Sequence, residues 1–165
     1  MTVSVQTARS AALPAIDSRL GVTALVAGAL ATIAFDLFGQ GIAPALGLAK
    51  LAPQGLASGA FKTVAGVSWG PAGELLHYLA GLVAYPLGWL LVARPLARAV
   101  APGLGWLVPA VAYGVVLWAF ALYVVAHLVV GMPAFLGFGG ITWVALAGHV
   151  LFALVAAGVA ERRGA

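Results

Sequence analysis

Apolar residues occupy long stretches of this chain, and charged residues stand mostly at the ends of those stretches. From Leu20 to Phe35 the chain is apolar except for two threonines, and no Asp, Glu, Lys or Arg occurs from Ala99 to Ala160. A helix of about 20 residues crosses the ~30 Å hydrocarbon layer of a membrane, whereas a helix over 99–160 would be about 90 Å long and must fold back. Breaks at Pro102-Gly103 and Gly131-Met132-Pro133 complete a pattern that predicts four spans, over about 20–39, 73–93, 104–130 and 139–160.

The segment between the first two predicted spans is rich in Gly and Pro and carries both lysines of the chain. Its middle part, Gln54 to Val67, has apolar residues at helical spacing. We expect a short interfacial helix there, in the first outer loop, with Lys62 toward water and three apolar residues toward lipid: Leu56, Phe61 and Val64.

The predicted architecture is therefore all-α, an integral membrane bundle of four transmembrane helices with that short interfacial helix. Residues 1–18 are expected to form a cytoplasmic tail, residues 19–161 a single transmembrane domain, and residues 162–165 a second cytoplasmic tail. Pro86 lies inside the second span, so a kink is expected near Tyr85.

The composition supports a membrane location and excludes several classes of function. Hydrophobic residues make up 64% of the chain, charged residues 7%, and mean hydropathy is +1.11. Soluble domains carry about 25% charged residues, so a soluble fold is excluded. The chain has no cysteine, which excludes disulfides, thiolate nucleophiles and iron–sulfur clusters. Its basic residues are scattered rather than gathered on one face, so we expect no nucleic-acid partner.

The distribution of basic residues also predicts the orientation. If both ends are cytoplasmic, six arginines lie inside and two lysines outside; the inverse topology reverses this ratio. The positive-inside rule therefore favours both termini in the cytoplasm. Four tryptophans near the predicted ends of spans suggest an aromatic belt: Trp69, Trp89, Trp106 and Trp143.

If the predicted helices cross a membrane, the number of residues between a side chain and the cytoplasmic end of its helix gives the depth of that side chain. Asp36 lies 17 residues from Arg19, and His77 lies 17 residues from Arg94, so both side chains are expected at one level, about 25 Å from the cytoplasmic arginines. Helical spacing also predicts facing. Asp36 continues the small-residue line Ala24, Gly28, Thr32, and His149 lies on the line Thr142, Ala145, Phe152, Ala153, Ala156.

Placing an ionisable side chain inside a membrane costs free energy, so such groups usually have a function. The ionisable side chains in the outer half of the membrane are therefore the candidate site. Its members are Asp36, Glu74, His77, His127 and His149, with Thr32, Gln40 and Tyr85 as supporting polar groups. One hypothesis is a single divalent metal held by Asp36, Glu74, His77 and His127. Another is haem b between His77 and either His127 or His149, with Gly81 and Gly148 making room for the macrocycle. A third is a proton or solute path lined by Asp36, Thr32, His77, Tyr85 and His149.

The remaining interpretation is structural: Asp36 pairs with His77, or Glu74 and His77 bond to Gln40 and tyrosines, and these contacts hold helices together. It is the one we favour. We therefore expect no cofactor and no catalytic residue, and predict a non-enzymatic accessory or interaction protein of a bacterial cytoplasmic (inner) membrane. Its expected partners are the lipid bilayer and either other membrane subunits or further copies of itself. The alternatives are a haem- or metal-binding redox protein and a proton- or solute-conducting subunit.

Overall fold

A computed structural model describes residues 17–164, and all regular secondary structure in that range is helical. Within it, 4 helices are long and apolar enough to cross a membrane: Ser18–Ala45, Ala72–Val100, Leu107–Val129 and Gly140–Arg162. The all-α prediction with four such helices is confirmed. Residues 1–16 of the predicted N-terminal tail and Ala165 lie outside the described residues.

The first long helix comprises α1 (Ser18–Asp36), a π-helical segment η1 (Leu37–Ile42) and the short α2 (Ala43–Ala45). Asp17 caps its start, because its carboxylate accepts a hydrogen bond from the Leu20 amide at 2.8 Å. The helix continues six residues beyond the predicted end at Gly39, and Pro44 is accommodated inside α2.

The second long helix passes two prolines without ending. It runs through α4 (Ala72–Leu79), η2 (Ala80–Ala84), α5 (Tyr85–Gly88), η3 (Trp89–Ala93) and α6 (Arg94–Val100). Pro86 and Pro95 each lie in the first two positions of an α-helical segment that follows a π-helical one. Proline lacks an amide proton and crowds the preceding turn, and the wider π turns accommodate this. The helix therefore extends past the expected end near Ala93.

The third helix comprises α7 (Leu107–Ala119) and the π-helical η4 (Phe120–Val129), and the fourth is α8 (Gly140–Arg162). Between them lies the short 3₁₀ segment η5 (Ala134–Phe138). Phe135, Leu136 and Phe138 have positive φ angles of 48°, 54° and 55°, a left-handed conformation that is unfavourable for side chains with a Cβ. Two hydrogen bonds hold this turn, from the Thr142 hydroxyl to the Phe135 carbonyl and from the Leu136 amide to the Pro133 carbonyl.

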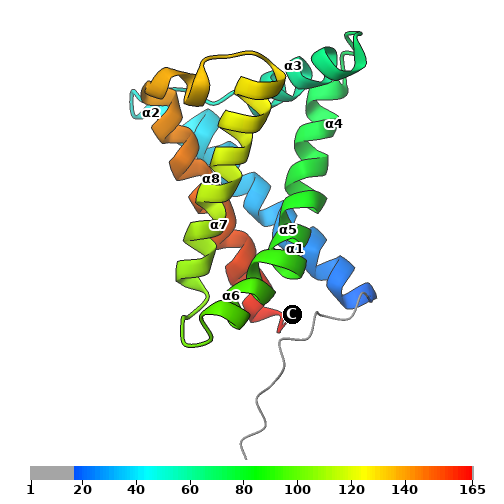
Figure 1. Cartoon of the computed structure of the whole chain (residues 1–165), viewed down its shortest axis with the longest axis vertical. Helices are drawn as coiled ribbons and strands as arrows, with labels where there is room; N and C mark the ends of the chain where they lie inside the picture. The colour runs from blue at the N-terminus through cyan, green and yellow to red at the C-terminus, as the bar shows by residue number, and fades with distance from the viewer. Residues whose placement is uncertain (1–16, 165) are drawn as a thin grey trace, which may run out of the picture.

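The long helices pack through the small residues that the sequence places on their inner faces. α1 and α7 both lie against α8, and α1 also contacts η2 (Figure 1). Ala24, Gly28 and Thr32 are buried, as are Thr142, Ala145 and Phe152, which confirms both predicted lines. A Cβ at Gly28 would lie 2.5 Å from the Leu82 carbonyl oxygen, and one at Gly114 would lie 2.6 Å from the Cα of Val150. Only glycine permits these two helix approaches.

α6, the end of α8 and the start of α1, which carry Arg94, Arg98, Arg162 and Arg19, lie at one end of the molecule (Figure 1). The Arg94 Nε donates to Glu161 at 2.6 Å, and Arg98 lies 3.7 Å from the same carboxylate. Arg19 donates to the Arg163 carbonyl at 2.9 Å. The described arginines on which the topology prediction depends thus share one end of the molecule.

Helix α3 (Pro53–Ala65) lies at the opposite end. It packs closely on α4, where a Cβ at Gly73 would meet the Gln54 carbonyl oxygen. Val64 is exposed, as predicted for a side chain that contacts lipid, whereas Leu56 is half-buried and lines a cavity between the helices. α3 thus turns Leu56 toward the other helices, and its expected contact with lipid stays a prediction.

Candidate functional site

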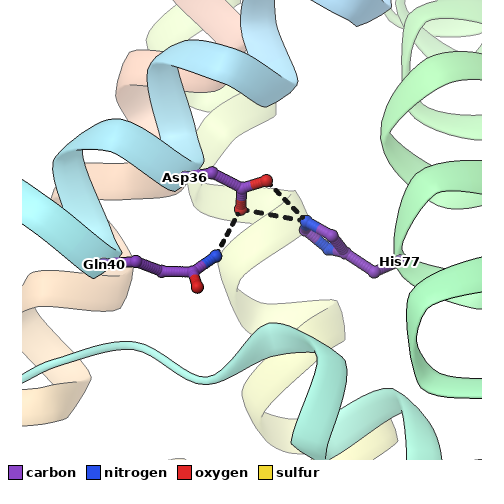
Figure 2. A network of polar contacts seen from close by, with 3 residues as sticks. All are labelled: Asp36, Gln40 and His77. Atoms are coloured by element: carbon purple, nitrogen blue, oxygen red, sulfur yellow. Dashed lines mark hydrogen bonds and ion pairs between the residues drawn. The ribbon is translucent and has the colours of Figure 1, made fainter.

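The closest contact between the predicted site residues joins α1 to α4. Asp36 is the last residue of α1, and its carboxylate oxygens lie 3.0 and 3.2 Å from the His77 Nε2. Gln40, one turn later in η1, donates its Nε2–H to Asp36 Oδ1 at 2.9 Å. Figure 2 shows the carboxylate between the amide and the imidazole. With Asp36 ionised, this contact is a hydrogen bond donated by the His77 Nε2–H, because a carboxylate only accepts.

This contact agrees with the depth argument, which assigned Asp36 and His77 to one level. The pairing of these two residues is confirmed. Gln40 takes part too, but it bonds to Asp36 and not to Glu74 or His77 as expected. Both side chains are largely withdrawn from the surface, at 12% exposure for His77 and 22% for Asp36. A carboxylate in such a place needs donors, and it has two here.

Glu74 and His127 lie apart from this pair. Glu74 is exposed in the first turn of α4. His127 bonds through Nδ1 to the Met132 carbonyl oxygen at 2.7 Å, with its ring beside Tyr123. In residues 17–164 no group of three or more His, Asp or Glu side chains is arranged to hold a metal ion. The four-ligand metal hypothesis therefore has no support in the geometry of the described residues.

His149 lies on the inner face of α8 and is 7% exposed. Its Nδ1 bonds to the Ala145 carbonyl oxygen at 2.7 Å, one turn back in the same helix. The Phe35 ring meets the imidazole edge-on at a centroid distance of 5.1 Å, and the same ring lies 6.2 Å from His77. His77 and His149, from two different helices, thus share one aromatic neighbour on α1.

Both of these histidines line a cavity of about 540 Å³. Its wall is formed by α1, α3, the second long helix, η4 and α8, and it is overwhelmingly apolar. Thr32 and Tyr85, predicted as supporting groups, also line it. The structure therefore joins His77, His149, Thr32 and Tyr85 around one space, with Asp36 and Gln40 behind His77.

π-helical backbone recurs around this cavity. η1 carries Gln40, η2 begins three residues after His77 and contributes Ala80 and Gly81 to the wall, and η4 contributes Ala121 and Val125. π-helical turns are rare and are frequent at functional sites. Three of the four long helices depart from α-helical geometry where they approach the cavity or its polar groups.

The glycines considered as space for a haem are already in contact with side chains. A Cβ at Gly81 would meet the Thr32 hydroxyl, and one at Gly148 would lie 3.0 Å from the Phe35 ring. Close packing against Thr32 and Phe35 therefore accounts for both glycines, and neither provides an open slot for a flat macrocycle.

The apolar part of the site was not predicted. Phe35, Phe120 and Phe152 contribute aromatic surface to the cavity, and α3 closes one side with Leu56 and Ala60. Apolar residues are frequent throughout this chain, so these positions carry no distinguishing sequence signal. Only the packing of five segments shows that they face one space.

We expect the Asp36–His77 contact to contribute modestly to stability. Interhelical hydrogen bonds within membranes average about 0.6 kcal/mol and reach about 1.7 kcal/mol. A double-mutant cycle with Asp36→Ala and His77→Ala, measured by reversible unfolding in mixed micelles, should give a coupling free energy in this range. Asp36→Ala with Glu74→Ala is the matched control and should be additive, since Glu74 is exposed. Equal coupling free energies in the two cycles would show that Asp36 and His77 do not interact specifically.

Comparisons with protein-family models, curated proteins and solved structures find no match for this chain. Four long apolar helices are compatible with a multi-pass membrane protein, and that is the class of protein the fold defines.

Proposed function

We propose that this chain is a non-enzymatic accessory protein of a bacterial inner membrane that holds a lipophilic small molecule between its helices. The cavity of about 540 Å³ carries this proposal. Small-molecule sites measure about 300–1,000 Å³, are mostly apolar, and contain a few convergent polar groups. Here the polar side chains are His77, His149, Thr32 and Tyr85 in an otherwise apolar wall. A ligand that is already dissolved in the bilayer would be available to such a site.

In the proposed orientation both termini face the cytoplasm, because the arginines gather at one end and the lysines lie toward the other. α3 would then lie at the outer surface of the membrane. Its exposed Val64 suits contact with lipid, and Lys62 in its last turn suits contact with headgroups.

Filling the cavity should remove the bound molecule. Ala80 lines the cavity, whereas Ala84, one turn later on the same helix, is exposed. We expect Ala80→Leu to lower the amount of co-purifying lipophilic molecule about tenfold, the effect of ~1.4 kcal/mol of steric cost. The measurement is solvent extraction and mass spectrometry of equal amounts of the protein purified in mild detergent.

Ala84→Leu adds the same side chain outside the cavity and is the matched control, so its extract should equal that of the parent protein. Identical extracts from the parent and both variants, with all three proteins monodisperse, would refute ligand binding in this cavity.

A further inference from the structure

We propose that the ligand of this cavity is a lipophilic phenol whose hydroxyl group donates a hydrogen bond to Nε2 of His149. The inference rests on the proposed function and adds the chemical class of the ligand. It depends on the hydrogen bonds of one buried imidazole and on the aromatic residues around it.

The hydrogen bond to Ala145 determines the role of each ring nitrogen of His149. A carbonyl oxygen only accepts, so the proton of this bond belongs to Nδ1. In a neutral imidazole the other nitrogen is then an acceptor with a free lone pair. Nε2 therefore offers a lone pair, and a ligand that matches it must be a donor.

No residue in the range 17–164 donates a hydrogen bond to that Nε2, although the His149 ring lines the cavity. Thr32 also lines the cavity, but its hydroxyl is packed against Gly81, so it is not a contact for the ligand. A polar atom without a partner in an apolar cavity is unfavourable, so a ligand that supplies one gains affinity. The His149 Nε2 therefore makes a hydroxyl-bearing ligand more suitable than a hydrocarbon.

The rest of the wall favours an aromatic ring next to that hydroxyl. Phe35 contacts His149 edge-on, and Tyr85 contacts Phe152 edge-on at 5.8 Å, and all four side chains line the cavity. Aromatic rings prefer offset or edge-to-face neighbours, so a ring in this space finds several partners. An aliphatic alcohol would satisfy Nε2 but would lack these ring contacts.

The test compares three radiolabelled probes by their retention on the purified protein in detergent: para-dodecylphenol, its methyl ether para-dodecylanisole, and dodecanol. The ether keeps the ring and tail but has no donor. Loss of one hydrogen bond corresponds to about a tenfold weaker affinity. We expect the parent protein to bind the phenol about tenfold more tightly than the anisole, and more tightly than dodecanol.

His149→Phe removes the acceptor and retains a ring of similar size against Phe35, so the ratio of phenol to anisole affinity should fall to about one. His127→Phe is the control, because His127 lies outside the cavity, and it should keep the parent ratio. The comparison of probes on the parent protein remains decisive if His149→Phe does not fold.

Equal affinity of the parent for the phenol and the anisole would overturn the hydrogen bond to His149, and equal affinity for the phenol and dodecanol would overturn the aromatic class. Failure of all three probes to bind would overturn the inference as a whole. The proposed function fails separately, only if the extraction experiment detects no difference between Ala80→Leu and the parent.

Discussion

Replacing Gly28 with leucine is expected to destabilise the protein by about 3 kcal/mol, which corresponds to a fall in Tm of about 10 °C. A Cβ at this position would lie 2.5 Å from the Leu82 carbonyl oxygen, 2.7 Å from the Gly81 carbonyl oxygen and 2.7 Å from the Leu82 Cα. All three are backbone atoms, so no side chain can turn aside to relieve the clash. α1 must move away from η2.

The matched control is Gly21→Leu on the same helix. Nothing lies within 4 Å of a Cβ at Gly21, and this residue is exposed. A leucine there should leave Tm unchanged or raise it slightly, because leucine favours a helix more than glycine does. Thermal unfolding in detergent, followed by circular dichroism, measures both variants. Equal Tm values for the two would show that the α1–η2 approach is not needed for stability.

The second large effect is expected at the arginine end. Arg94 is 8% exposed, and its Nε lies 2.6 Å from Glu161. Replacing it with methionine preserves much of the apolar stem but leaves the carboxylate without its main partner. Removing one partner of a buried ion pair costs about 3 kcal/mol or more, so Arg94→Met should unfold at much lower denaturant concentration.

Two further variants make this prediction specific. Arg98→Met is the control, because Arg98 is 57% exposed and lies 3.7 Å from the carboxylate; its effect should be within about 0.5 kcal/mol. The double variant Arg94→Met with Glu161→Met removes both charges and should recover most of the stability. A double variant as unstable as Arg94→Met alone would show that the lost stability came from packing and not from an unpaired charge.

The number and approximate extent of the long helices follow from local properties of the chain. Hydrophobic run length and helical rise are known without any tertiary contact, so four spans could be predicted from the sequence. The same arithmetic assigned Asp36 and His77 to one depth, and the two side chains are in contact. Small-residue lines on α1 and α8 were also readable, because helical periodicity determines which residues share a face.

Helix ends at prolines were less predictable. The second helix was expected to stop near Arg94, but it continues to Val100 through a π-helical segment before Pro95. Trp89, inside this helix, is buried among the neighbouring helices. It is 1% exposed and packs on Tyr113, so its assignment to an interfacial belt is wrong. Whether a helix continues past a proline depends on how the helices packed around it accommodate the disturbed turn. The local sequence pattern does not contain this information.

By itself, the sequence determined the class of this protein, the number of its long helices and the level at which the Asp36 carboxylate meets a histidine, because each follows from hydropathy, length and rise. Only the tertiary structure decided that Glu74 and His127 lie away from that pair and that His149 shares a cavity with His77. The rotation of each helix about its axis and the position of α3 determine these relations. Both depend on the packing of segments far apart in the chain, and the apolar residues that line the cavity resemble those that face lipid.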